Sequence, residues 1–150
     1  MPYGRITDPD PDSPTLTFNT IGRHQSRIVR TRVVSNLSPW FSGLEVGEIV
    51  NIPISHGEGR FIAPDTLLKQ LIAKGQIATQ YVDLDGIPTS DLRFNPNGSV
   101  LAIEGISSPD GRVLGKMGHS ERVGPGLYQN VPGNYDSRLF ESAVQYFRGQ

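Results

Sequence analysis

Runs of apolar residues divide the chain into short strand-like segments separated by turn residues. Six strands are predicted from their β-branched and apolar content, at residues 15–18, 26–35, 48–55, 77–83, 100–106 and 112–116. Segment 48–55 (EIVNIPIS) is apolar almost throughout, which is typical of a strand buried on both faces. Pro109-Asp110-Gly111 predicts a hairpin between the last two strands. The pattern therefore predicts a domain dominated by a sheet.

Two segments have the 3.6-residue periodicity of a helix. The first starts at Ala63-Pro64-Asp65, ends at Gly75 and carries an apolar stripe of Leu67, Leu68, Leu71 and Ile72. The second covers residues 136–147, with Asp136 or Ser137 as its cap and an inward face of Leu139, Phe140, Ala143, Val144 and Phe147. A single helical turn after Ser38-Pro39 is predicted to insert Trp40 and Phe41 into the core. Three prolines in residues 7–14 (TDPDPDSP) predict an exposed loop.

The helices are too few for the predicted sheet. A strand that is buried on both faces requires covering elements on both sides, and two helices do not supply them. We therefore expect either further helices outside these residues or another chain over one face of the sheet.

Composition narrows the class of protein. The 150 residues suit a single domain, the net charge is −1, and no apolar run reaches the length of a membrane span. This balance favours neither nucleic acid nor a membrane surface as a partner, and a cytoplasmic location is the default expectation. The sequence has no cysteine, so these residues supply neither a disulfide, nor a cysteine-based zinc site, nor a thiol nucleophile.

Two His-x-Glu pairs are the strongest candidates for chemistry. His56-Gly57-Glu58 and His119-Ser120-Glu121 each follow a predicted strand. Residues i and i+2 of an extended segment point to the same side, so each glutamate is placed to accept a hydrogen bond from its histidine and orient it as a general base. The alternative for each pair is an ordinary solvated strand end.

Other chemistries fit the sequence less well. A His-Glu-x-x-His zinc motif and a Gly-x-Ser-x-Gly nucleophile turn are both absent, and GRVLGKM (111–117) is one residue too short for a phosphate-binding loop. We therefore expect no metal site. Arg23, Arg27, Arg30 and Arg32 form a basic run without stacking aromatic residues, which favours a solvated edge strand or an acidic partner surface over nucleic acid.

Taken together, the segments PYGRI, TFNTIGRHQSR, SPWFSG, IPISHGEGRF, GQIATQYVD and NPNGS, followed by AIEGISSPDGRVLGKMGHSER, carry a family resemblance. The chain resembles the C-terminal part of the glutamine amidotransferase domain of phosphoribosylformylglycinamidine synthase, in order and over essentially residues 1–150. The resemblance implies an α/β fold, an incomplete flavodoxin-like class I amidotransferase domain with a mixed sheet and few covering helices. It also implies a Cys-His-Glu triad that hydrolyses glutamine and delivers ammonia for purine biosynthesis.

The resemblance assigns roles residue by residue. His119 and Glu121 match the histidine and glutamate of the triad, although family members often have proline where this chain has Ser120. Ser55, His56 and Gly57 match the segment that binds glutamine, and Glu58 and Arg60 would shape the site or the synthetase interface. The resemblance places no cofactor in this chain, whereas ATP and Mg²⁺ act at the synthetase site of the parent enzyme.

The resemblance also indicates what these residues lack. The family's nucleophilic cysteine lies in a glycine-rich turn before the segment PYGRI, so His119 would activate a cysteine that this sequence does not contain. We therefore expect a truncated domain that is inactive alone, works with the rest of the synthetase, and exposes a sheet edge through which it could form homo-oligomers. The alternative is a non-catalytic binding or regulatory domain that retains the amidotransferase fold.

Overall fold

The computed structural model describes residues 13–149, so most of the loop predicted at 7–14 lies outside the described residues. This part of the chain contains seven strands: β1 (Thr15–Thr17), β2 (Gln25–Val33), β3 (Ile49–His56), β4 (Arg60–Ile62), β5 (Ile77–Tyr81), β6 (Ile103–Ser107) and β7 (Leu114–Lys116). The helices are α1 (Asp65–Ala73) and α2 (Leu139–Arg148), with the 3₁₀ turns η1 (Pro39–Phe41), η2 (Val100–Ala102) and η3 (Ser120–Arg122). No helix among the described residues has the length and apolar character needed to cross a bilayer.

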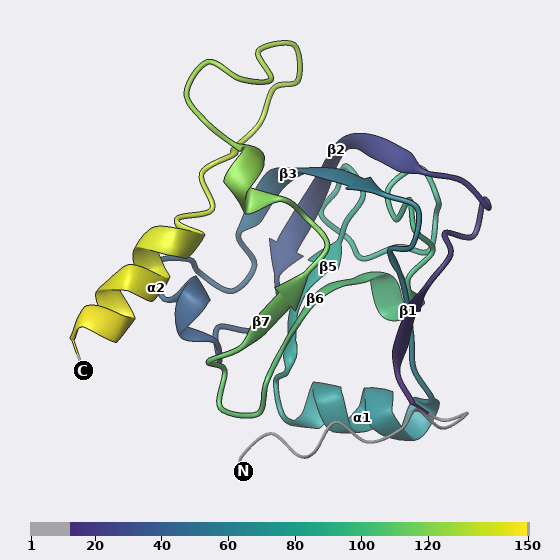
Figure 1. Cartoon of the computed structure of the whole chain (residues 1–150), viewed down its shortest axis with the longest axis horizontal. Helices are drawn as coiled ribbons and strands as arrows, with labels where there is room; N and C mark the ends of the chain where they lie inside the picture. The colour runs from purple at the N-terminus through teal and green to yellow at the C-terminus, as the bar shows by residue number, and fades with distance from the viewer. Residues whose placement is uncertain (1–12, 150) are drawn as a thin grey trace.

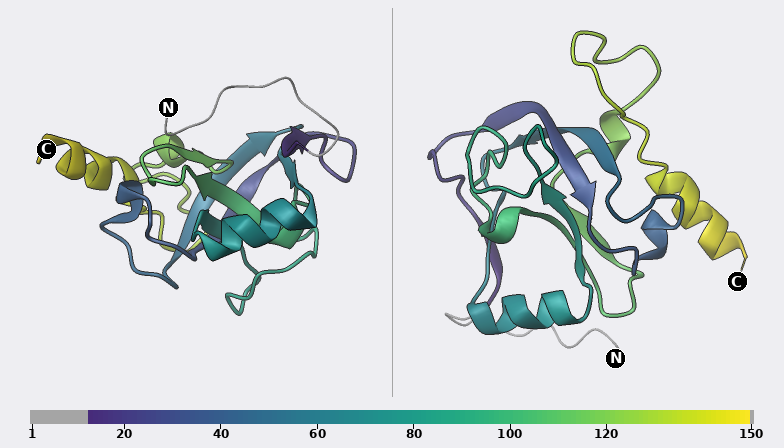
Figure 2. Two further views of the ribbon diagram at one scale, coloured as in Figure 1. Left: turned by 90° about the horizontal axis from the view of Figure 1, so that it is seen from below. Right: turned by 180° about the vertical axis from the view of Figure 1, so that it is seen from behind.

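Five of the strands form a curled sheet in the order β3-β2-β5-β6-β7 (Figure 1). All four pairings in this sheet are antiparallel, and β1 pairs with β4 in a separate two-stranded ribbon. Helix α1 lies across one end of the sheet, whereas α2 projects sideways from the sheet and packs against η1 (Figures 1 and 2). The curl brings the chain that leaves β7 close to β3, which is the far edge of the same sheet. There the amide of His119 donates a hydrogen bond to the carbonyl of Pro53 at 2.9 Å.

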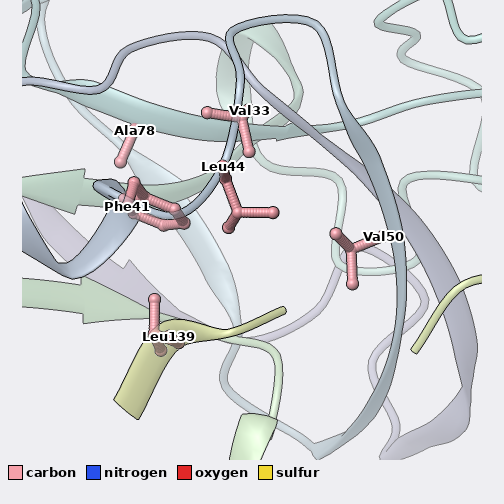
Figure 3. Close-up of a cluster of buried hydrophobic side chains, with 6 residues drawn as sticks. All are labelled: Val33, Phe41, Leu44, Val50, Ala78 and Leu139. Carbon is pink, nitrogen blue, oxygen red and sulfur yellow. The ribbon is translucent and has the colours of Figure 1, made fainter. Parts of the chain in front are cut away.

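The core forms where η1 and α2 close one face of the sheet. Strand β3 is buried over residues 50–54, as its apolar sequence predicts. One cluster joins the sheet, η1 and α2 through Val33, Phe41, Leu44, Val50, Ala78 and Leu139 (Figure 3). The predicted insertion of Phe41 is confirmed, and Trp40 packs half-buried at the margin of this cluster. A second cluster under α1 includes Leu68, Leu71 and Ile103.

Both helices depart from the predicted apolar faces. In α1, Ile72 is 57% exposed, although Leu68 and Leu71 are buried as expected. In α2, Leu139 and Ala143 are buried, but Phe140, Val144 and Phe147 are exposed. The predicted cap is also wrong, because α2 begins after Arg138 in a left-handed conformation and has no side-chain cap. The apolar stripe of α2 is thus wider than the face that the described residues cover.

The strand predicted at 100–106 begins later than the pattern indicates. Residues 100–102 form η2, in which Leu101 and Ala102 have φ values of 50° and 55°, so the extended chain starts only at Ile103. A left-handed backbone at two consecutive non-glycine residues is uncommon and turns the chain sharply before β6. Similarly, β7 begins at Leu114 rather than at residue 112.

The prediction that the arginine run lies on a solvated edge strand is wrong for the arginines of β2. Strand β2 lies between β3 and β5, and its arginine side chains reach the loop that follows β5. Arg30 donates to the carbonyls of Asp83 and Leu84, and Arg32 donates to the carbonyl of Gly86 at 3.0 Å. These cations therefore cap backbone carbonyls of their own chain.

Candidate functional site

His119 and Glu121 form a hydrogen-bonded ion pair directly after β7. The Nδ1 atom of His119 lies 2.6 Å from Oε1 of Glu121, and Arg122 Nε lies 3.6 Å from the same carboxylate oxygen. The contact arises because His119 directly precedes the 3₁₀ turn Ser120–Arg122, and its carbonyl accepts a hydrogen bond from the amide of Arg122 at 3.1 Å. The backbone is therefore a tight turn rather than the extended segment predicted. The pairing itself is as expected. It leaves Nε2 of His119 without a hydrogen-bond partner among residues 13–149.

The environment favours the ionised form of Glu121. Partial burial of the carboxyl raises its pKa, but hydrogen bonds from its own backbone N–H and from His119 outweigh that effect and hold the pKa below its ordinary value. A carboxylate in this position fixes the imidazole with Nδ1 toward Glu121 and stabilises the imidazolium when the ring takes up a proton. The pair can therefore serve as an oriented general base.

The backbone at 118–119 is held against β3. Gly118 packs so closely on β3 that a Cβ atom there would lie 2.7 Å from Cγ2 of Ile52. The next residue is tied by the hydrogen bond from His119 to Pro53. Position 118 therefore requires glycine, and the ring of His119 is placed by backbone contacts as well as by Glu121.

Glu104, a buried carboxylate of β6, also holds this segment. Its side chain is fully buried, accepts hydrogen bonds from Thr79 Oγ1 and from the amide of Gly118, and lies 3.4 Å from Nζ of Lys116. Sequence reasoning missed Glu104, although a lone charged residue in the apolar run AIEGI was a usable signal. Because it binds the residue before His119, Glu104 positions the candidate base.

The second His-x-Glu pair does not form. Glu58 is exposed and makes no hydrogen bond with His56, because the chain after β3 reverses into β4 rather than forming a turn like η3. Instead, the ring of His56 lies 6.1 Å from the ring of His119, centroid to centroid. Its Nε2 atom is buried and has no hydrogen-bond partner. Burial lowers the pKa of His56, reinforced by His119 and opposed by Asn97, so the environment favours the neutral form of the ring.

The turn between β3 and β4 is held by two buried asparagines that sequence reasoning did not select. Asn19 donates to the carbonyl of His56 at 2.8 Å and accepts from the amide of Gly59 at 3.1 Å. Asn97 donates to Asn19 Oδ1 at 2.7 Å and accepts from Tyr81 Oη at 3.0 Å. Burial, with the nearby carboxylate of Glu104, raises the pKa of Tyr81 well above its usual value, so it remains a hydrogen-bond donor.

The other predicted substrate-side residues line the same end of the sheet. Ser55 Oγ lies 3.3 Å from Nε2 of His24, so all three histidines of the chain gather along the edge formed by the ends of β2 and β3. Gly57 accepts a hydrogen bond from the amide of Asn19 through its carbonyl. Arg60 lies in β4 opposite Thr17, and its Nε is buried without a hydrogen bond.

A pocket of about 400 Å³ opens beside His119 and Glu121. It lies between β7 and the pair η1 and α2, and its walls include Trp40, Leu114, Leu139 and Phe140. A larger pocket of about 580 Å³ lies near the end of α1 and contains none of the candidate residues. Among residues 13–149, no three histidine, aspartate or glutamate side chains converge as metal ligands.

Comparison with known proteins gives consistent matches. The family model of the CobB/CobQ-like glutamine amidotransferase domain matches residues 1–147. The phosphoribosylformylglycinamidine synthase subunit PurQ of Thermomicrobium roseum is 45% identical over 95 residues, which are 63% of this chain and 39% of that protein. A chain in the structure of PurLQS from Thermotoga maritima superposes with a TM-score of 0.66 and 27% identity, over 90% of this chain and 53% of that chain. The likeness confirms the α/β fold class expected from the resemblance.

The present chain thus spans about two fifths of the length of the curated relative and about half that of the solved one.

Proposed function

The chain belongs to the CobB/CobQ-like glutamine amidotransferase domain family, and on this premise we propose that it supplies the base and the orienting acid for glutamine hydrolysis. The observation that carries the proposal is the 2.6 Å contact between His119 and Glu121 at the border of an open pocket. The kinship with a phosphoribosylformylglycinamidine synthase subunit supports purine biosynthesis as the pathway that consumes the ammonia.

The proposed mechanism follows from the free nitrogen of His119. Nε2 takes the proton of a cysteine thiol, and the resulting thiolate attacks the side-chain amide carbon of glutamine. The imidazolium, stabilised by Glu121, then returns the proton to the departing ammonia, which leaves a thioester. His119 next deprotonates a water molecule that attacks the thioester, which releases glutamate and regenerates the thiol. Because the 150 residues have no cysteine, the thiol comes from polypeptide outside this sequence.

The second histidine region forms the substrate side in this proposal. Ser55, His56 and Gly57 sit at the end of β3 and face the same edge as His119, with the ring of His56 6.1 Å from that of His119. A neutral, partly buried His56 with a free Nε2 suits a hydrogen bond to a polar group of the substrate. Glu58 and Arg60 shape the rim, with Glu58 exposed toward solvent or the synthetase.

Partners and cofactors follow from the same proposal. The chain acts with the remainder of the synthetase, on the same polypeptide or on another subunit. ATP and Mg²⁺ serve a separate synthetase site, and this chain binds neither.

The test is a chimera in which this chain replaces the matched portion, 53%, of the related chain in PurLQS from Thermotoga maritima. Glutamate release is measured for the chimera, for its His119→Ala and Glu121→Gln variants, and for the isolated chain. We expect His119→Ala to lower kcat by about 10⁶-fold and Glu121→Gln by about 10⁴-fold, because the base and its orienting acid act as one unit. The isolated chain should be inactive. The matched control is Glu45→Gln, which alters an exposed carboxylate that does not line the pocket beside His119.

Two results would contradict the proposal. The first is glutaminase activity of the chimera that survives His119→Ala. The second is a folded chimera that binds glutamine without hydrolysing it, which would favour a non-catalytic binding domain instead.

A further inference from the structure

The pocket of about 580 Å³ near the end of α1 is separate from the site beside His119. It lies between the C-terminal end of α1, strand β5, residues 88–90 and η2, and it shares no lining residue with the pocket beside His119. We call it the α1 pocket. Its volume falls within the range of about 300–1,000 Å³ that is typical of small-molecule sites. The proposed hydrolysis of glutamine gives this pocket no role.

Apolar side chains line the α1 pocket from two different elements. Ile72 of α1 is 57% exposed and Leu101 of η2 is 48% exposed, and both line the pocket. Ile77 and Ala102 also line it and are buried. Ile72 belongs to the apolar stripe that predicts the inward face of α1, so the pocket accounts for its exposure. A hollow with apolar walls is characteristic of a ligand site, whereas single apolar side chains on a surface are ordinary.

The charge of the pocket restricts the ligand. None of the residues of the described chain that line the α1 pocket is an aspartate, glutamate, lysine, arginine or histidine. A charged ligand would lose contact with water there without gaining a counter-ion, which is unfavourable. Free glutamine carries both an ammonium and a carboxylate group, so it does not suit this pocket. The ligand that fits is neutral.

Gln80 of β5 gives the pocket directional hydrogen bonds. Its Nε2 donates to the carbonyl of Leu101 at 2.7 Å, which holds the side chain against η2. A primary amide has two N–H donors and one carbonyl oxygen. The oxygen of Gln80 accepts no hydrogen bond from residues 13–149, so this oxygen and one N–H remain for a ligand. A molecule with its own N–H beside a C=O, as in an amide or lactam, can satisfy both groups.

The η2 wall of the pocket is fixed in an unusual backbone conformation. Leu101 and Ala102 have φ values of 50° and 55°, and both line the pocket. Such a conformation is unfavourable for residues other than glycine, persists only where the surroundings enforce it, and is concentrated at functional sites. Here the hydrogen bond from Gln80 holds Leu101, and the amide of Ala102 donates to the carbonyl of Ser99 at 3.2 Å. The wall is therefore formed before any ligand binds.

We propose that the α1 pocket binds a neutral, flat, mainly apolar molecule that carries an N–H beside a C=O, as a lactam does. Gln80 pairs with that group, and Ile72 and Leu101 enclose the ring. The inference goes beyond glutamine hydrolysis and does not depend on it, because the pocket contains none of the residues assigned to that reaction.

A second copy of this chain is the competing occupant. Ile72 and Leu101 could instead be covered by an apolar surface of the other copy. Coverage would then depend on protein concentration and would need no lactam, so the two occupants are distinguishable.

The experiment titrates the full 150-residue chain, labelled with ¹⁵N, with 2-quinolone, a neutral bicyclic lactam. Backbone and side-chain amides are followed by NMR, together with the size of the protein by light scattering. We expect a Kd of about 0.1–1 mM, the range for a ligand of this size, and shifts of the Gln80 side-chain amide and of the backbone amides at 101–102.

Two analogues of the probe separate the contributions. Quinoline-2-carboxylate has the same ring with a negative charge, and we expect it to bind at least about tenfold more weakly. 1-Methyl-2-quinolone lacks the N–H and should bind about three- to tenfold more weakly, because the oxygen of Gln80 then loses its donor.

Three variants locate the contact. Gln80→Met keeps the length of the side chain without the amide, and it should weaken binding of 2-quinolone by about three- to tenfold. Ile72→Ser changes an exposed side chain of the wall and should weaken binding about tenfold. Its matched control is Val144→Ser, which removes a similarly exposed apolar side chain on α2 that does not line the α1 pocket, and which should leave binding unchanged.

The proposal is overturned if about 5 mM 2-quinolone, several times the weakest expected Kd, shifts no amide at the α1 pocket. It is also overturned if the carboxylate binds as tightly as the lactam, or if Ile72→Ser and Val144→Ser have equal effects. Self-association of the chain that shifts the amides of Ile72 and Leu101 without any probe would assign the pocket to a second copy instead.

Discussion

Replacement of Glu104 by glutamine tests whether a buried charge stabilises the segment that carries His119. The carboxylate lies in β6 with no exposed side-chain surface, and its cation, Lys116, is only 12% exposed. Glutamine retains the shape and two of the contacts, because its amide oxygen can accept from Gly118 and its amide nitrogen can donate to Thr79. What it removes is the negative charge opposite Lys116. The change therefore isolates the electrostatic contribution.

The magnitude follows from the burial of the pair. Loss of one partner of a buried ion pair costs about 3–5 kcal/mol, because the other charge stays desolvated. Lys116 retains some contact with water and donates to the carbonyl of Gly118 at 3.3 Å, so we expect the lower limit, about 3 kcal/mol. For a chain of this size, about 2–4 °C of Tm is lost for each kcal/mol, which gives a fall of about 6–12 °C.

A double-mutant cycle with Lys116→Met completes the test. Urea unfolding monitored by circular dichroism gives the free energy of unfolding of the parent, both single variants and the double variant. The double variant should be less destabilised than the sum of the singles by about 1–3 kcal/mol. Asp91→Asn is the control, since Asp91 and Arg93 form an exposed pair 2.6 Å apart whose loss should leave Tm unchanged. A Tm loss below about 2 °C for Glu104→Gln, or a coupling energy near zero, would refute the reasoning.

The two remaining predictions concern the turn that follows β3. Burial lowers the pKa of His56, and His119 acts in the same direction whereas Asn97 opposes it. Below about pH 6.5 this histidine therefore binds a proton more readily in the unfolded chain than in the folded one. The free energy of unfolding should therefore fall between pH 7.5 and 5.5, and His56→Asn should flatten that slope in urea titrations; an unchanged slope would contradict it. A Cβ atom at Gly59 would lie 2.2 Å from Asn97 Nδ2 and 2.3 Å from His56 Cδ2, so Gly59→Ala should destabilise the fold by about 1–3 kcal/mol. Gly115→Ala is the control, because its Cβ atom would meet open space, and it should lower the free energy of unfolding by no more than about 1 kcal/mol in the same assay. Equal losses of stability in the two variants would count against the packing argument.

The strands and the local turn at η1 could be predicted from sequence because their signals are local. The run 48–55 became the buried strand β3, and Ser38-Pro39 did start the turn that buries Phe41. The predicted start of β6 was wrong, because the left-handed backbone at Leu101 and Ala102 cannot be recognised in an apolar pattern. The predicted buried face of α2 was too wide, because periodicity shows the width of an apolar stripe but not which part of it other residues cover. Phe140 is apolar at the right position and is nonetheless exposed.

The two His-x-Glu pairs show most clearly where local reasoning ends. Both have the same spacing, yet only His119 and Glu121 form a hydrogen bond. The difference lies in what holds the backbone after each strand. After β3 the chain is drawn into β4 by Asn19, which binds the carbonyl of His56 and the amide of Gly59, so the side chain of Glu58 is turned to solvent.

After β7 the chain is instead fixed by partners that lie far away in the sequence. Glu104 binds the amide of Gly118, and Pro53 accepts from the amide of His119, which leaves Ser120–Arg122 to close a 3₁₀ turn that brings Glu121 back to the ring. The geometry of the His119–Glu121 pair is thus a consequence of sheet curl and a buried carboxylate, and the spacing of the motif is necessary for it but not sufficient.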